Sequence, residues 1–510
     1  MAKSIINHLV RNYVRRRYSR IEAMRTKPLE LQQNLLRQLL SHGVHTEWGK
    51  QQGFSSIKTP HDFSQAMPIQ VYEDVQPYIE RMMHGESSVL WPGKTTWYAK
   101  SSGTSTNRAK YIPVTKQKLR QAHVSSGWDA VSIYYHHHPA ARMFSERNLL
   151  IGGSIAAYQP HPETRYGDIS AIMIHHMPWV GRPFYSPDYH LLLQPDWELK
   201  IQYIVDHCLD HNITTVIGVP TWVVSIFTAI LEHTGREHIH EVWPELHMYM
   251  HGGVGFEPYR DMFNKFLPHG MSYLEGYNAS EGYFAMQDEL SQSGLLLLTD
   301  NGVYYEFLPL EEFGKDAPRA IGLKNVRIGQ DYALVISTVS GLWRYMPGDT
   351  IQFVSINPYR IKVTGRTSQY INAFGEELVV SNADRAITKA AAAHGAIVNE
   401  YTVAPIYMTA GEGGGHEWLI EFHSAPDSLP NFRHSLDQYV KESNTDYAAK
   451  RFKDIAMRLP QVHALPQGTF LKWMKSNNKL GAQHKIPRLS NDRKIVEQIL
   501  SFTNESISYA

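Results

Sequence analysis

Ser101-Ser102-Gly103-Thr104-Ser105-Thr106-Asn107-Arg108-Ala109-Lys110 is the most informative stretch of this chain. A strand-like alternation over residues 95–100 precedes it and a second short one over residues 110–114 follows it, so the stretch forms the tip of a strand-turn-strand. Consecutive backbone N–H groups with nearby hydroxyls make a concavity for phosphate oxygens, and Gly103 permits backbone conformations that other residues resist. The stretch lacks the Gly-Lys-Ser/Thr ending of a P-loop. We expect an anion-binding loop, with an ordinary polar hairpin as the alternative.

After the loop the sequence alternates strands, glycine turns and helices. We expect a strand ending at Gly152-Gly153, further strands over residues 171–174, 215–219, 246–250 and 271–274, and a helix over residues 221–233. This alternation predicts a mostly parallel sheet covered by helices, with ligands gathering beyond the carboxyl ends of the strands.

The later part of the chain changes character twice. Residues 295–298 and 303–307 flank Asn301-Gly302, which is a strong hairpin signal, and strands over residues 332–338, 352–355 and 360–363 follow. We therefore expect the large domain to end in antiparallel, β-barrel-like structure. Thr364-Gly365-Arg366 then precedes helices and strands of a small α+β unit. The prediction is an α/β fold with mixed sheets, comprising a large N-terminal domain (residues 1–363) and a small mobile C-terminal lid domain (residues 364–510).

The composition indicates a soluble globular protein of two or three domains. With 510 residues and 43% hydrophobic content, the chain can bury a sizeable core. Its 50 basic and 49 acidic residues nearly cancel, so no overall field attracts nucleic acid or an anionic membrane. The single cysteine, Cys208, excludes an intramolecular disulfide and a multi-cysteine metal site and agrees with a reducing compartment. A buried structural thiol is a commoner role for it than a nucleophile.

The start of the chain predicts two helices interrupted at Pro28. No apolar run approaches the roughly 20 residues that cross a bilayer, and the secretory pattern of charged, apolar and cleavage regions is lacking. The basic residues before Glu22 fit a transit peptide, a membrane-facing helix or a solvated helix face; they are Arg15, Arg16, Arg17 and Arg20. An accompanying apolar stripe favours the solvated face of a packed helix. We expect a cytoplasmic protein without membrane or nucleic-acid partners.

Two later stretches follow the Ser/Thr-rich loop in a specific order: Tyr277-Asn278-Ala279-Ser280-Glu281-Gly282 and Trp343-Arg344-Tyr345-Met346-Pro347-Gly348-Asp349. Together the three resemble the nucleotide-binding motifs of the acyl-acid amido synthetases. This is the Gretchen Hagen auxin-responsive family of the adenylate-forming acyl/aryl ligase superfamily, known for joining plant hormones to amino acids. Residues 81–86, 364–366 and 481–488 extend the resemblance over almost the whole chain. Asn107 stands where the family commonly has glycine, and asparagine tolerates the left-handed conformation better than most residues.

The resemblance implies a large adenylate-forming domain and an ATP-dependent amido synthetase that uses Mg²⁺. A carboxylic acid becomes an acyl-adenylate with release of pyrophosphate, and the acyl group then passes to the amine of an amino acid with release of AMP. Closure of the small domain would exclude water and later admit the amine. The partners are thus a small carboxylic acid and an amino acid. The sequence does not specify which acid and which amino acid they are, which residue is the general base, or the oligomeric state. The rivals are an acid–thiol ligase acting on coenzyme A and a nucleotide-binding regulator without catalysis.

The same resemblance assigns the phosphate contacts. The phosphates would be gripped by Ser101, Ser102, Gly103, Thr104 and Ser105, with Lys110 assisting. Lys485 resembles the mobile-domain lysine that reaches the α-phosphate, with a solvated tail lysine as the alternative.

The second and third motifs supply the remaining nucleotide contacts. Tyr277 offers a flat face for adenine within the motif that also holds Ser280, and Glu281 is a hard oxygen ligand suited to Mg²⁺. Asp349 resembles the acceptor of the ribose hydroxyls. Arg366 would contact ribose or phosphate from the hinge. Core packing, a surface carboxylate and a turn aspartate are the structural alternatives for Tyr277, Glu281 and Asp349.

The acyl pocket has weaker signals. The strand-to-helix turn near the predicted sheet edge supplies candidate pocket walls, which are Val219, Thr221 and Trp222.

Overall fold

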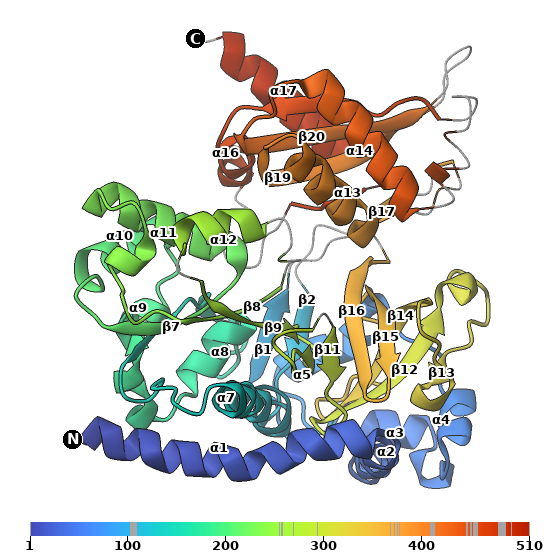
Figure 1. Cartoon of the computed structure of the whole chain (residues 1–510). Helices are drawn as coiled ribbons and strands as arrows, with labels where there is room; N and C mark the ends of the chain where they lie inside the picture. Colours follow the sequence, from blue (N-terminus) through green and yellow to red (C-terminus); the bar gives the residue numbers. More distant parts are fainter. Residues whose placement is uncertain are drawn as a thin grey trace. The chain divides into compact units, whose positions relative to one another are not determined.

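The structure is a computed structural model in which the chain forms two compact units. One comprises residues 1–254 and 266–362, and the other residues 255–265 and 363–510. The structure describes all residues except 1, 102–109, 254–255, 257–258, 269, 293, 368, 372, 375, 377, 408–413, 445–446, 449–450, 452–456, 478–485, 491 and 509–510. Figure 1 shows both units, each of which is described by itself. The mobility expected of residues 364–510 stays a prediction.

The first unit is built on one mixed sheet of 12 described strands. Its order is β13 (Ile321–Gly322), β12 (Val303–Pro309), β14 (Asp331–Thr338), β15 (Asp349–Ile356), β16 (Tyr359–Arg366), β11 (Leu295–Leu297), β10 (Tyr283–Met286), β9 (Ser272–Asn278), β8 (Met248–Gly252), β7 (Ile213–Ile217), β3 (Arg147–Leu150) and β6 (Tyr185–Ser186). The neighbouring strands β6, β3, β7, β8 and β9 pair in parallel. The pairs β9–β10, β10–β11 and β11–β16 are antiparallel, as are β12–β14 and β14–β15. The mixed α/β fold expected from the sequence is confirmed.

A second sheet carries the strands on either side of the Ser/Thr-rich loop. Its order is β2 (Lys110–Pro113), β1 (Trp97–Ser101), β5 (Arg165–Gly167) and β4 (Ile155–Ala157). Strands β1 and β2 pair antiparallel with Ser101 opposite Lys110, so the expected strand-turn-strand is confirmed at its flanks.

Helices surround these sheets (Figure 1). The helices are α1 (Ala2–Thr26), α2 (Pro28–Gly43), α3 (Glu47–Gln51), α4 (Pro60–Ala66), α5 (Tyr72–Met83), α6 (Lys116–Lys118), α7 (Ser125–His137), α8 (Ile169–His175), α9 (Tyr189–Leu192), α10 (Trp197–His207) and α11 (Pro220–Thr234). Helix α12 (Arg260–Phe266) belongs, except for its last residue, to the second unit. A π-helical segment, Leu119–Val124, joins α6 to α7. The break between α1 and α2 falls at Pro28, as the sequence predicts.

The hairpin expected around Asn301-Gly302 is wrong. Strand β11 pairs with β10 and β16, whereas β12 pairs with β13 and β14. The buried amide of Gln32 donates hydrogen bonds to the carbonyls of Thr299 and Val303, at 3.1 and 2.9 Å. Helix α2 therefore supplies the donor for two carbonyl groups that a hairpin would have paired with backbone N–H groups.

The strand expected over residues 171–174 is also wrong, because these residues lie in helix α8. The run Ala171-Ile172-Met173-Ile174 is short and apolar, and such a run fits a buried strand and a buried helix equally well.

The basic face of α1 is less solvated than the sequence suggests. Arg17 pairs with the buried carboxylate of Asp129 at 2.8 Å, and Arg20 pairs with Asp300 at 2.9 Å. The Arg17–Asp129 pair and the ring contact between Tyr13 and Trp128, with centroids 5.3 Å apart, hold α1 beside α7 (Figure 1). Among the described residues, no helix is long and apolar enough to cross a membrane.

The second unit has an α+β composition. Its sheets are β19 (Ile397–Ile406), β20 (Gly415–Ser424) and β21 (Gln461–Leu465), in that order, and the pair β17 (Tyr370–Ile371) and β18 (Leu378–Val379). Its helices include α13 (Val380–Ala393), α14 (Leu429–Ser443), α16 (Thr469–Ser476) and α17 (Lys494–Ser508). Helices α13 and α14 pack side by side over a core of small and aromatic residues (Figure 1).

Cys208 lies in the core of the first unit, and its position yields a test. The residue is fully buried at the end of α10, and burial raises the pKa of the thiol to about 12. The thiolate is the reactive form, so the native protein at pH 8 should react with a thiol reagent at least about a hundredfold more slowly than the urea-unfolded chain. Absorbance of the released chromophore measures both rates. Comparable rates would contradict the structural role.

Candidate functional site

Tyr277 and Asp349 come from different halves of the large sheet and meet directly. The Tyr277 hydroxyl, at the end of β9, donates a hydrogen bond of 2.6 Å to Oδ2 of Asp349, the first residue of β15. Strands β10, β11 and β16 lie between these two in the sheet order. Four strand spacings in a flat sheet would separate them by about 19 Å. The antiparallel half must therefore curve back strongly, which suits the barrel-like character expected from the sequence.

A buried ion pair fixes the turn that leads to Asp349. Arg344 donates through Nε and Nη2 to the carboxylate of Glu306 on β12, at 2.9 and 3.0 Å. The remaining nitrogen, Nη1, donates to the carbonyls of Ser64 and Met67. Arg344 has a φ of +43°, in the left-handed region that non-glycine residues rarely adopt. The guanidinium contacts hold this strained turn and hence the position from which β15 begins.

Ser280 and Glu281 are both buried in the turn after β9. Beneath them lies Lys118, whose ammonium group donates to the Ser280 carbonyl at 2.6 Å and to the Pro113 carbonyl at 3.1 Å. Burial lowers the pKa of Lys118 to about 7, and the Glu281 carboxylate opposes that shift. Glu281 is therefore no surface carboxylate, and its hard oxygen atoms fit a divalent cation that is also bound by phosphates.

His123 lies in the π-helical segment next to this cluster. Both of its ring nitrogens are buried, and the Asn278 side chain is a polar group that interacts with the ring. Burial and the nearby charge of Lys118 lower the pKa of His123 to about 3, so the ring is neutral near pH 7. Single π-helical turns occur frequently at functional sites, which draws attention to this segment.

The phosphate-loop residues divide between described and undescribed parts of the chain. Ser101 ends β1 and Lys110 begins β2, with the Lys110 ammonium nitrogen 5.5 Å from the centroid of the Tyr72 ring. Ser102, Gly103, Thr104 and Ser105 lie outside the described residues. Their role and that of Lys110 toward phosphate stay predictions.

The residues expected to line the acyl pocket lie at the same sheet edge as Tyr277. Ile217 pairs with Met250, and Gly252 pairs with Gly276. Val219, two residues beyond Ile217, therefore follows β7 at the level of Gly276, the residue before Tyr277. A Cβ atom on Gly252 would come within 2.1 Å of the Gly276 carbonyl oxygen, so the strands approach too closely for a side chain there. Trp222 is buried in α11, and Thr221 is the second residue of the same helix. Their contact with an acyl group remains a prediction.

Arg366 and Lys485 belong to the second unit. Arg366 ends β16, and Lys485 lies outside the described residues, so their nucleotide contacts stay predictions. The chain directly after Lys485 is firmly held: the Val403 N–H donates to the Arg488 carbonyl at 2.8 Å. The Arg488 guanidinium pairs with Glu400 at 3.0 Å and lies 4.3 Å from the centroid of the Tyr401 ring.

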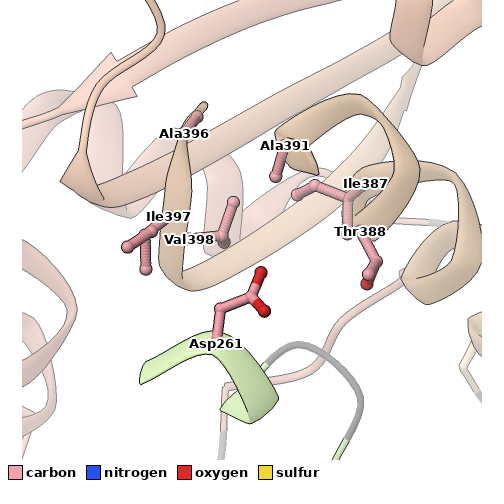
Figure 2. Close-up of a pocket in the computed structure, with 7 residues that line it drawn as sticks. All are labelled: Asp261, Ile387, Thr388, Ala391, Ala396, Ile397 and Val398. Atoms are coloured by element: carbon pink, nitrogen blue, oxygen red, sulfur yellow. The ribbon is translucent and has the colours of Figure 1, made fainter. Parts of the chain in front are cut away.

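A small hollow occurs within the second unit. Its lining residues are Asp261, Ile387, Thr388, Ala391, Ala396, Ile397 and Val398 (Figure 2). The Asp261 carboxylate faces the apolar side chains of α13 and β19 in that view (Figure 2). None of the residues that the motifs single out lines it, so it is separate from the candidate nucleotide site.

The fold is that of the adenylate-forming ligases. A solved structure of the GH3.15 acyl acid amido synthetase superposes with a TM-score of 0.77 at 17% identity, over 96% of this chain and 95% of that one. A 2-hydroxyisobutyryl-CoA ligase in its postadenylation state superposes with a TM-score of 0.56 at 13% identity, over 94% and 92%.

Sequence comparison identifies the family. The pattern of the GH3 family N-terminal domain matches residues 17–271, that of the central domain residues 296–366, and that of the C-terminal domain residues 381–494. The chain belongs to the GH3 family. A probable indole-3-acetic acid-amido synthetase, GH3.1 of Arabidopsis thaliana, is 23% identical over 94% of this chain and 92% of its own length. GH3.8 of Oryza sativa subsp. indica, an indole-3-acetic acid-amido synthetase, is 22% identical over 94% and 91%.

Sequence reasoning missed Lys118, His123 and the role of Arg344. Lys118 and His123 sit in a helix that reads as ordinary, and only their burial sets them apart. The sole local signal was for Arg344, which is embedded in the third motif.

The Asp349 carboxylate gives a direct test of the nucleotide contact. Asp349→Ala should raise the KM for ATP at least about tenfold, because a lost hydrogen bond to a charged group costs about 1.5–3 kcal/mol. The melting temperature should change little, and Asp316→Ala, at an exposed loop position, is the matched control. Initial rates over a range of ATP concentrations measure the effect. An unchanged KM would refute the assignment to ribose.

The Arg344–Glu306 pair gives a test of stability. Arg344→Met should lower the free energy of unfolding by about 3–5 kcal/mol, since it leaves a buried carboxylate without its partner. Arg142→Met removes an exposed pair with Glu146 and should change stability by less than about 1 kcal/mol. Urea unfolding measures both variants. Equal effects would show that the buried pair does not hold the turn.

Proposed function

We propose that this chain is an ATP-dependent acyl-acid amido synthetase that activates a small carboxylic acid as its acyl-adenylate and transfers the acyl group to an amino acid. Membership of the GH3 family and the fold support this assignment. The observation that carries it is the direct hydrogen bond of 2.6 Å between Tyr277 and Asp349, which joins the second and third nucleotide motifs into one site.

The chemistry assigns a task to each group at this site. A carboxylate is a poor acyl donor, and conversion to an adenylate supplies a good leaving group. Asp349 binds the ribose, Tyr277 packs against the base, and the loop from Ser101 to Ser105 with Lys110 holds the phosphates. Arg366 contacts ribose or phosphate, and Lys485 reaches the α-phosphate. Glu281 holds Mg²⁺, which supplies neutralisation of the phosphate charge when bound.

The acyl group occupies the sheet edge beyond β7 and β8, where Val219, Thr221 and Trp222 form part of the wall. Ligands of α/β folds gather beyond the carboxyl ends of parallel strands, and Val219 stands at that end. We infer that the substrates are small organic acids and amino acids. The cytoplasm remains the expected location.

Adenylation is tested by acid-dependent exchange of pyrophosphate into ATP, with Mg²⁺ and without an amine. We expect exchange with at least one acid of a broad panel, loss of exchange in excess EDTA and recovery on addition of Mg²⁺. Radiolabelled pyrophosphate measures the exchange. ATP binding without exchange across the panel would favour a binding-only protein.

The acceptor is tested by AMP release with an active acid. Mixed amino acids should stimulate release, and mass spectrometry should detect the amide. Coenzyme A is the competing acceptor, because solved structures with this fold include a coenzyme A ligase. Turnover with the thiol alone would assign the chain to the acid–thiol ligases.

A further inference from the structure

Lys118 is an internal cation that connects two parts of the candidate site. Its side chain is fully buried, and its ammonium group donates to the carbonyls of Pro113 at 3.1 Å and Ser280 at 2.6 Å. Pro113 ends β2, the strand that follows the Ser/Thr-rich loop, and Ser280 immediately precedes Glu281. One side chain therefore links the base of the loop hairpin to the peptide that presents Glu281.

The backbone of Lys118 is fixed independently. Its N–H donates to Oγ1 of Thr115 at 3.0 Å, and the Thr115 hydroxyl donates to the Val339 carbonyl at 2.7 Å. Because the helix start is tied to the residue after β14, the lysine stem has a defined origin. The ammonium group can then act as a rigid spacer between the two carbonyls rather than follow either of them.

A second buried lysine shows what a purely structural link looks like. Lys200 donates to the carbonyls of Gly152 at 2.5 Å and Leu192 at 3.1 Å and is also buried. Both lysines satisfy loop carbonyls, and a buried ammonium requires such partners. Lys118 differs in that one of its partners is bonded to the residue proposed to hold Mg²⁺, and that residue's carboxylate interacts with the lysine charge.

We propose that Lys118 is a positioning residue for Mg²⁺-ATP: it locks the Ser280–Glu281 peptide to strand β2, so that the Glu281 carboxylate is held in a preformed position for the nucleotide. The inference rests on the proposed function. Preorganisation of this kind matters because a displacement of about 1 Å in a reacting group can cost about a hundredfold in rate.

A double-mutant cycle on the dissociation constant of Mg²⁺-ATP tests the proposal, with Lys118→Met and Glu281→Gln as the single changes. Each should weaken binding about tenfold. Because Lys118 acts through Glu281, the two losses should not multiply. The dissociation constant of Mg²⁺-ATP for the double variant should be at most about three times the larger of the two single-variant constants. Isothermal titration calorimetry gives all four constants in the full-length protein without any acid substrate. If Lys118→Met does not fold, Lys118→Gln, which keeps a donor, takes its place in the cycle.

Lys200→Met is the matched control, since it removes a comparable buried ammonium elsewhere in the same unit. We expect it to lower the melting temperature about as much as Lys118→Met and to leave Mg²⁺-ATP binding within about twofold of wild type. Multiplicative losses in the cycle, or equal weakening by Lys200→Met, would overturn the positioning role. Exchange by the wild-type enzyme would then leave the amido synthetase assignment standing, whereas a wild type that binds no Mg²⁺-ATP would overturn both.

Discussion

Strand β9 pairs in parallel with β8 on one edge and antiparallel with β10 on the other, and the candidate site is built around this change of direction. Strands that arrive in parallel from β7 and β8 end at the edge where Val219 lies. On the other side, antiparallel strands curve until β15 places Asp349 against Tyr277, at 2.6 Å. Since β9 belongs to both halves, its carboxyl end is where an acyl group and a nucleotide can meet.

Buried charge is used here to hold backbone segments rather than to add stability. Arg344 donates hydrogen bonds to the carbonyl oxygens of Ser64 and Met67 near the end of α4, and Lys118 donates to those of Pro113 and Ser280. Moving a charged group out of water costs free energy, and the attraction of its partners largely offsets that cost. Such a group therefore adds little net stability, but it fixes the positions of the groups that it contacts. Arg344 fixes the third motif, and Lys118 fixes the second motif.

The fold accounts for activation better than for transfer. An amido synthetase and a coenzyme A ligase share this fold, and their names indicate different acyl acceptors. Both structures nevertheless superpose on at least 94% of the present chain. The motif residues are all proposed to bind the nucleotide. Family membership rather than the geometry of the described residues therefore assigns the amine acceptor.

The sequence by itself determined much of the alternation of strands and helices and the positions of the three motifs. Helix periodicity, the Pro28 break and the runs before Gly218 and after Lys110 are local properties, so short-range preferences were sufficient to find them. The tertiary structure alone decided that β11 and β12 separate despite Asn301-Gly302, that Tyr277 contacts Asp349, and that Lys118 lies under Ser280. These features depend on pairing and burial between residues that are distant in the chain: Tyr277 and Asp349 are 72 positions apart, and Lys118 and Ser280 are 162 apart. No local sequence pattern encodes such distant partners.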